Sequence, residues 1–314
     1  MRGEGGESRG VTGASGKDGG LALITVLLIT AILVALTVEF AYRIYIGAAR
    51  AGNLRDSSRA SLLATDGVVI GKSGLEKLLE SRPNLVMGAE GLKFTQDLGD
   101  GLSIEITVLD EYSKASLRTV YAATGLSNEK IEGVYSRLLE ILGLDNRLSE
   151  PLADWVDADD DPRPYGAEAR EYSSLKNPHG VRNGYVEAAG ELRLIKGYSR
   201  EVMRKIEPFV SPYNTDGLIN INTAPKEVLL ALDESMTDTL AEAVIEYRDA
   251  TPFKDKSDIL KARGFSTIGY AMQDKITVES RVYRIRSRAR AGDAVKEAEA
   301  VVKTGGPILF WSES

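Results

Sequence analysis

The feature that most constrains the fold is a run of 18 uncharged residues, from Leu21 to Val38, near the start of the chain. Three of them are Thr, and all the others are Leu, Ile, Val or Ala. As a helix, this run extends roughly 27 Å, close to the ~30 Å thickness of the hydrocarbon core of a bilayer. The run therefore predicts a membrane-spanning helix rather than a buried helix of a soluble domain.

The boundary in front of this run carries a second signal. Gly19 and Gly20 directly precede the apolar residues, whereas an ordinary secretory signal has its small-residue cleavage site after them. Cleavage between Gly20 and Leu21 would keep the helix in the mature protein. This arrangement resembles the class III leader of type IV pilins and of the pseudopilins of type II secretion. The fifth mature residue of those families is usually Glu, and here it is Thr25. Among pseudopilins, the absence of this Glu is typical of the minor pseudopilin family called general secretion pathway protein K.

Composition and charge exclude several classes of function. The net charge is −7, which argues against a nucleic-acid partner held by clustered Lys and Arg. There is no cysteine, so a disulfide scaffold, a thiolate zinc site and a cysteine nucleophile are excluded. His179 is the single histidine, and we interpret it as a loop residue beside Pro178 and Gly180. No catalytic constellation is recognisable, and we expect no enzyme activity.

Periodicity divides the rest of the chain into a sheet and a helical block. Helical character continues from the apolar run until Pro83, although Gly67, Gly71 and Gly74 weaken it locally. Alternating apolar residues predict strands over 93–97, 102–109, 276–290 and 294–303, and the apolar spacing between residues 127 and 268 is mostly helical. The strand over 276–290 carries alternating Arg residues, which we expect to pair with Glu297 and Glu299 on the returning strand rather than with nucleic acid.

Four blocks strengthen the resemblance to the protein K family and follow that family's order. They cover residues 110–114, 152–159, 191–197 and 219–225, and together with the leader they span most of the chain. The resemblance implies an α+β fold in which a long N-terminal transmembrane pilin-like helix packs on an antiparallel sheet, with a large all-α domain inserted between strands. The boundaries we expect are a prepilin leader at 1–20, the helix at 21–82, the sheet at 83–114 and 275–304, and the inserted domain at 115–274.

The last block also resembles the helix-hairpin-helix module of DNA-binding competence proteins. In such a hairpin, Gly residues let backbone N–H groups approach a phosphate, but the connection here reads Asp233-Glu234-Ser235-Met236. Between Asp216 and Arg263 there are ten acids and six bases, the wrong sign for DNA. We therefore interpret Thr223 as the N-cap of a structural helix with Pro225 in its first turn.

An acidic loop inside the predicted insertion is the candidate metal site. Asp157, Asp159, Asp161 and Glu168 match side-chain positions 1, 3, 5 and 12 of a calcium-binding loop. Pro162 stands where an EF-hand needs Gly, which makes a true EF-hand doubtful, and the acids also fit a solvated surface. The resemblance adds an expectation of calcium in the helical domain.

Together, these observations predict a minor pseudopilin of the type II secretion system, located at the tip of the periplasmic pseudopilus. The resemblance implies a single-pass protein of the bacterial inner membrane with its C-terminal domain in the periplasm. It also implies other minor pseudopilins, the prepilin peptidase and the inner-membrane secretion platform as partners. A membrane-anchored DNA-uptake protein and a minor subunit of a type IV pilus are the alternatives.

Overall fold

A computed structural model describes residues 17–314, so most of the predicted leader lies outside the described residues. The chain divides into two units, 1–58 and 59–314. In the first unit, helix α1 (Lys17–Ser81) begins, and its most apolar 18-residue window has a mean hydropathy of 2.9 with no part of that window buried. Helix α1 is thus long and apolar enough to cross a membrane, as the sequence predicts. It ends two residues before Pro83, which cannot continue a helix.

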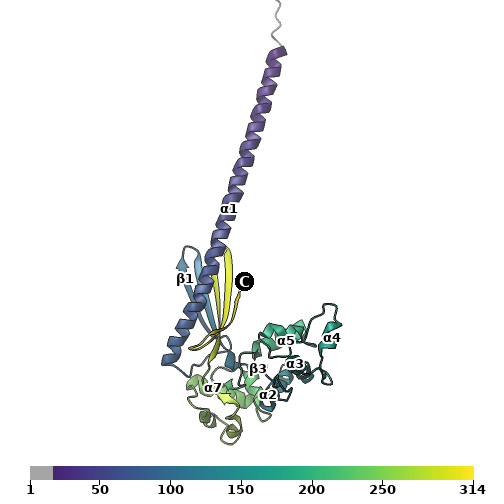
Figure 1. The fold of residues 1–314 in the computed structure, drawn as a ribbon. Coiled ribbons are helices and arrows are strands. Elements are labelled where there is room, and N and C mark those ends of the chain that lie inside the picture. Colours follow the sequence, from purple (N-terminus) through teal and green to yellow (C-terminus); the bar gives the residue numbers. More distant parts are fainter. Residues whose placement is uncertain (1–16) are drawn as a thin grey trace, which may run out of the picture. The chain divides into compact units, whose positions relative to one another are not determined.

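The second unit contains the end of α1, an antiparallel sheet and the inserted domain (Figure 1). The sheet has five strands in the order β1-β2-β7-β8-β9. Their bounds are β1 (Leu92–Gly99), β2 (Leu102–Asp110), β7 (Val282–Ala291), β8 (Ala294–Lys303) and β9 (Ile308–Glu313). All four neighbouring pairs are antiparallel, and the chain leaves the sheet at the end of β2 and returns in β7 beside it. The predicted sheet with an insertion is confirmed.

Small residues let α1 approach the sheet closely. Ala64 and Val68 of α1 are buried in one hydrophobic cluster with Ile104 and Ile106 of β2 and Ile285 of β7. A Cβ atom added at Gly67 would lie 2.1 Å from Oγ of Ser287, and one added at Gly71 would lie 2.8 Å from Cγ2 of Ile285. These two glycines therefore do more than lower helix propensity, because a larger residue at either position would push the helix away from the sheet.

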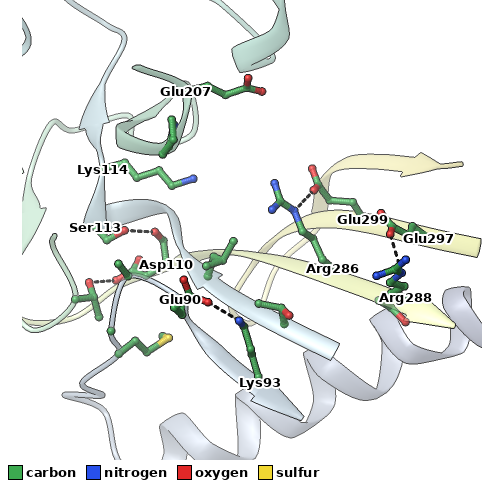
Figure 2. Close-up of a pocket in the computed structure, with 18 of the residues that line it drawn as sticks. Glu90, Lys93, Asp110, Ser113, Lys114, Glu207, Arg286, Arg288, Glu297 and Glu299 are labelled. Atoms are coloured by element: carbon green, nitrogen blue, oxygen red, sulfur yellow. Dashed lines mark hydrogen bonds and ion pairs between the residues drawn. The ribbon is translucent and has the colours of Figure 1, made fainter. Parts of the chain in front are cut away.

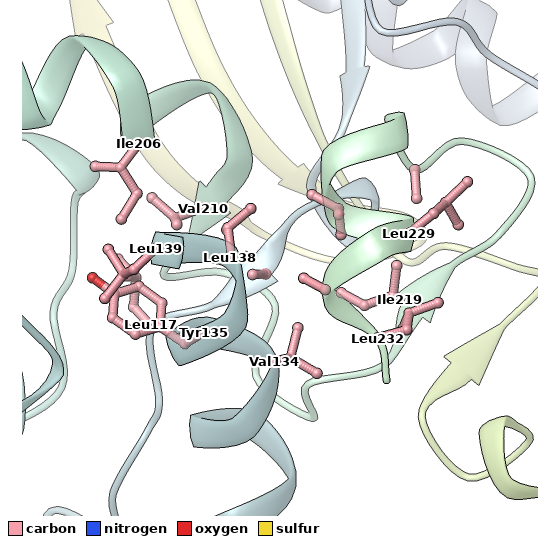
Figure 3. Packing of buried hydrophobic residues seen from close by; sticks show 14 of the residues in the cluster. Leu117, Val134, Tyr135, Leu138, Leu139, Ile206, Val210, Ile219, Leu229 and Leu232 are labelled. Carbon is pink, nitrogen blue, oxygen red and sulfur yellow. The ribbon is translucent and has the colours of Figure 1, made fainter. Parts of the chain in front are cut away.

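The inserted domain is mostly helical and has its own core (Figure 3). Its helices are α2 (Glu129–Ile141), α3 (Ser149–Val156), α4 (Ala169–Ser173), α5 (Arg200–Ile206), α6 (Lys226–Ala231) and α7 (Asp238–Ala250). On α2, the apolar spacing buries Val134, Tyr135, Leu138 and Leu139 on one face. Figure 3 shows these side chains between Ile206 of α5 and helix α6, which carries Leu229. The core of the domain is therefore separate from the core under α1.

Four two-residue strands lie in the same domain, and the sequence predicted strand character only for the last of them, as the start of the range 276–290. They are β3 (Ala115–Ser116), β4 (Val210–Ser211), β5 (Ile219–Asn220) and β6 (Ile276–Thr277), and they form two parallel pairs, β3 with β4 and β5 with β6. The insertion is thus not all-α. Residues 276–277 belong to it rather than to the sheet, so the expected sheet boundary at 275 was wrong. Strand β9 was also missed, because its apolar residues follow a Gly-Gly-Pro turn at the end of the chain.

A buried carboxylate joins the insertion to the sheet. Asp110, the last residue of β2, is 3% exposed and accepts hydrogen bonds through Oδ2 from Thr223 Oγ1 (2.5 Å), Ser280 Oγ (2.6 Å) and Asn220 Nδ2 (3.1 Å). The N–H of Tyr112 donates to Oδ1 at 2.8 Å. Burial raises the pKa of Asp110, and these hydrogen bonds act against that shift. Two of the family-like blocks, at 110–114 and 219–225, therefore meet at one junction.

This junction corrects the interpretation of Thr223. Helix α6 has Pro225 at its N-cap position without a side-chain hydrogen bond, and the hydroxyl of Thr223 points to Asp110 instead. A helix cap would accept a hydrogen bond from a backbone N–H of α6, whereas this hydroxyl donates a charge-assisted hydrogen bond to a buried carboxylate. The residue that resembled a helix cap is therefore part of the connection between the two halves of this unit.

Candidate metal centre

The acidic loop connects two helices of the inserted domain. Asp157 is the C-cap residue of α3, and Glu168 is the N-cap residue of α4 without any side-chain capping bond. The twelve positions from Asp157 to Glu168 thus form a helix-loop-helix segment, as the spacing predicts, although Pro162 remains in the place of the EF-hand glycine. The end of α3 is buried, so the loop starts from a fixed point in the core.

Three of the four predicted ligands are brought together. One carboxylate oxygen from each of Asp157, Asp159 and Glu168 lies within 4.8 Å of the others. Asp161 does not join them: it is exposed, and its backbone N–H donates to Asp159 Oδ1 at 3.0 Å. Its contribution to the loop is therefore a turn hydrogen bond, which any residue except Pro would supply.

Burial makes this cluster different from ordinary surface acids. Asp157 is 1% exposed and Glu168 is 5% exposed. Asp157 Oδ1 and both carboxylate oxygens of Glu168 have no hydrogen-bond partner among the residues that the structure describes. Buried carboxylate oxygens that lack a partner are costly, and a hard cation is the ligand they suit best. Hence the donor set fits calcium on chemical grounds.

The pKa of Glu168 reflects the same crowding. Burial, together with the negative charges of Asp154, Asp157, Asp159 and Asp160, raises this pKa to about 7. A cation held between these oxygens would offset their mutual repulsion. The electrostatics therefore favour a positive ligand at this position.

Two neighbours that the sequence did not single out as ligands complete the surroundings. Asp154 lies one helical turn before Asp157, is fully buried, and together with Asp157 contacts the guanidinium of Arg163. Gly125 has a φ of +63°, and a Cβ there would lie 2.9 Å from Asp157 Oδ2. The three-residue spacing of Asp154 and Asp157 was visible in the sequence, but the contribution of Gly125 depends on a contact between distant segments.

His179 lies in a loop close by, as predicted. Its ring is 5.0 Å from that of Tyr172 and 5.8 Å from that of Trp155, measured between centroids. The indole N–H of Trp155 donates to Glu191 at 2.9 Å. These aromatic rings pack beside the acidic loop. Trp155 directly follows Asp154, so the fluorescence of Trp155 should respond to changes in the loop.

A groove of about 1060 Å³ lies elsewhere, between the outer face of the sheet and the inserted domain (Figure 2). Its charged side chains are largely engaged with one another. Arg286 contacts Glu299 at 2.5 Å and Arg288 contacts Glu297 at 3.3 Å, as the sequence predicted for this face. Arg286, Arg288 and Arg290 are exposed and form a solvated sheet face, whereas Arg284 is largely buried and contacts Glu111 at 2.7 Å.

The predicted cleavage site lies on α1 in the first unit. Gly20 and Leu21 are both exposed, and Leu21 is 70% exposed. The hydroxyl of Thr25 donates to the carbonyl oxygen of Leu21 at 2.9 Å, so this side chain is satisfied within its own helix. Residues 1–16 of the leader lie outside the described residues.

Comparison with known proteins decides the family. Two family models, both described as type II secretion system protein K, match residues 113–215 and 219–279. The chain belongs to the protein K family of type II secretion systems. It is 26% identical to type II secretion system protein K of Aeromonas hydrophila over 92% of this chain and 94% of the relative. The protein K of Pseudomonas aeruginosa is 28% identical over 77% of this chain and 76% of that relative.

A solved structure supports the fold of this protein K family member. The crystal structure of the GspK-GspI-GspJ complex from the enterotoxigenic Escherichia coli type 2 secretion system contains a chain that matches with a TM-score of 0.70. The match has 18% identity and covers 84% of this chain and 99% of that one. The α+β pseudopilin fold is thus confirmed, and the family is that of a minor pseudopilin of type II secretion, a structural subunit.

Proposed function

We propose that this minor pseudopilin caps the periplasmic end of the pseudopilus and that calcium bound in its inserted domain stabilises that cap. The orphaned oxygens of Asp157 and Glu168 are the observation that carries the calcium part. Asp157, Asp159 and Glu168 would hold the ion, and the ion would supply the positive charge that this buried acidic cluster needs. The protein acts as an assembly subunit rather than an enzyme.

Thermal unfolding of the full chain in detergent, in calcium and in chelator, tests the calcium part. At a free calcium concentration of about 100 times Kd, binding adds roughly 2.7 kcal/mol, or a rise in Tm of about 5–10 °C for a unit of this size. The variant Asp157→Ala with Asp159→Ala should lose this rise. Asp161→Ala is the matched control from the same loop and should keep it. Equal Tm values of the unmutated protein in calcium and in chelator would reject the proposal.

The position at the tip rests on the first turns of α1. In pilins, the Glu at the fifth mature position is thought to neutralise the N-terminal ammonium of a neighbouring subunit, and an unpaired charge in apolar surroundings is costly. Thr25 is uncharged, and its hydroxyl donates a hydrogen bond to the carbonyl oxygen of Leu21. A subunit with no neighbour above it needs no carboxylate there.

The inserted domain supports the same position for a different reason. It is a separate packed body between β2 and β7, held to the sheet by Asp110, and such a bulky body fits the end of a filament more easily than a close-packed repeat. We also propose that the other minor pseudopilins are its partners, that the prepilin peptidase cleaves after Gly20, and that residues beyond Ala41 lie in the periplasm. Co-purification of the full chain with the other minor pseudopilins, compared with the major pseudopilin, tests the partners.

The DNA-uptake alternative receives little support from the hairpin around α6 and α7. Its basic residues are engaged: Lys226 contacts Asp238 (2.7 Å) and Glu242 (2.8 Å), and Arg248 is 6% exposed and donates to the carbonyl oxygens of Ile221 and Ala224. These contacts are those of a structural hairpin. If the purified chain shifted the electrophoretic mobility of duplex DNA in a salt-dependent way, this alternative would be favoured instead.

A further inference from the structure

Arg163 lies inside the acidic cluster and contacts it through several atoms at once. One guanidinium nitrogen lies 2.5 Å from Asp154 Oδ1 and 2.7 Å from Asp157 Oδ2. The other terminal nitrogen donates to the carbonyl oxygen of Gly125 at 2.9 Å, and the backbone N–H donates to Asp154 Oδ2 at 3.1 Å. The side chains of Asp154 and Asp157 are 0% and 1% exposed, so these pairs are shielded from water on the carboxylate side.

These contacts divide the carboxylate oxygens into two sets. Arg163 occupies both oxygens of Asp154 and one oxygen of Asp157. Among the buried carboxylate oxygens of this cluster, those that have no hydrogen-bond partner within residues 17–314 are the second oxygen of Asp157 and both of Glu168. Arg163 therefore separates Asp154 from the group formed by Asp157, Asp159 and Glu168, although all four acids lie close together.

We infer that Arg163 is a built-in counter-charge that holds the acidic loop in its folded form without an ion and fixes which oxygens face the ion. This inference rests on the calcium site proposed above. The single positive charge of Arg163 neutralises only part of the negative charge of Asp154, Asp157, Asp159 and Glu168. A divalent cation would neutralise more of that charge. Arg163 is a positioning residue, because it acts on the ion through Asp157 and the loop.

Without Arg163, two buried carboxylates would lose their counter-charge, which is among the most destabilising changes a core can suffer. We expect Arg163→Gln to lower the Tm of the full chain by roughly 10 °C in chelator. In saturating calcium the loss should be smaller, because the ion then neutralises part of the same charge. The calcium-induced rise in Tm should therefore be larger in Arg163→Gln than in the unmutated chain.

A double-mutant cycle with Asp154→Asn separates this function from simple packing. Asp154→Asn keeps the shape of the side chain and removes one of the two buried negative charges. In chelator, the fall in Tm of the double variant should therefore be clearly smaller than the sum of the falls in the two single variants. The double variant also keeps the test possible if Arg163→Gln alone does not fold. Arg193→Gln is the matched control, since Arg193 and Glu207 form an exposed pair at 3.5 Å, and its Tm should change little.

The possible results are distinguishable. Additive losses in the cycle, or a loss for Arg163→Gln that is the same in calcium and in chelator, would overturn the counter-charge inference. Absence of a calcium response in the unmutated chain would instead reject the calcium site, and a non-additive cycle in chelator would then still support the pairing of Arg163 with the two aspartates.

Discussion

Adding one methyl group at Gly71 should destabilise the protein, although the same change elsewhere in a helix stabilises it. Gly71 is buried in α1, and a Cβ there would lie 2.8 Å from Cγ2 of Ile285 and 2.9 Å from Cγ2 of Ile106. Both contacts are with γ-methyl groups of β-branched residues in strands, whose χ1 angles are stiff. The methyl can therefore be accommodated only by moving the helix off the sheet.

The size of the effect follows from two opposing contributions. Replacing Gly by Ala in a helix gains up to about 1 kcal/mol, whereas overpacking a core costs about 1–3 kcal/mol. We expect Gly71→Ala to lose about 1–2 kcal/mol in net terms. Gly74→Ala is the matched control on the same helix, three residues further on, where an added Cβ has nothing within 4 Å. That variant should gain about 0.5–1 kcal/mol.

The assay is the Tm of the full chain in detergent for both variants. Their difference of about 1.5–3 kcal/mol corresponds to roughly 3–12 °C for a unit of this size. If Gly71→Ala were as stable as Gly74→Ala, the close approach of α1 to β2 and β7 would not be a constraint on this fold, and the reasoning from these contacts would be refuted.

Three further predictions concern one ion pair and the first helix. A hydrogen bond from Lys275 lowers the pKa of Asp233 to about 2. The pair therefore adds about 1–2 kcal/mol to the free energy of unfolding above pH ~4, and this contribution is lost as the pH falls towards about 2. The Asp233→Asn variant should therefore be less stable than the unmutated chain at pH 7 and should lose less stability between pH 4 and 2. The same dependence of stability on pH in both proteins would contradict this. Gly20→Val should leave the leader attached, which mass analysis of the membrane form detects; a mature terminus beyond Ala41 would indicate an ordinary secretory signal instead. Thr25→Val should preserve secretion, and loss of secretion with the protein still inserted would count against the tip position.

Much of the fold was predictable because its signals are local or periodic. The apolar run from Leu21, the stop at Pro83 and the alternation in β2 and β7 each follow from a few neighbouring residues. The short parallel pairs β3–β4 and β5–β6 could not be predicted, since two-residue strands have no periodicity and depend on pairing across the domain. Thr223 was misinterpreted for the same reason, because a cap signal cannot reveal a distant buried Asp110.

The candidate site shows the same limit. Spacing along the loop predicted Asp157, Asp159, Asp161 and Glu168 as ligands, and the structure brings three of these carboxylates close together but leaves Asp161 outside the group. Whether a side chain in an irregular loop points inward depends on backbone turns that the spacing does not specify. Arg163 gave no signal at all, because one Arg among many acids looks like an ordinary surface charge until its partners are known to be buried.

The adjacency of β2 and β7 has a consequence for how the protein folds. Asp110 and Tyr283 are paired residues of these strands, so their ladder closes a loop of about 170 residues. Closing so long a loop from an unfolded chain costs about 3–4 kcal/mol more in entropy than closing a tight turn. If the inserted domain folds first, it brings its two ends together. Strands β2 and β7 can then pair as if a short hairpin turn joined them. Refolding of the sheet should therefore wait for the insertion, and variants that weaken the core around Leu138 should slow the appearance of the β2–β7 pairing although they lie outside the sheet.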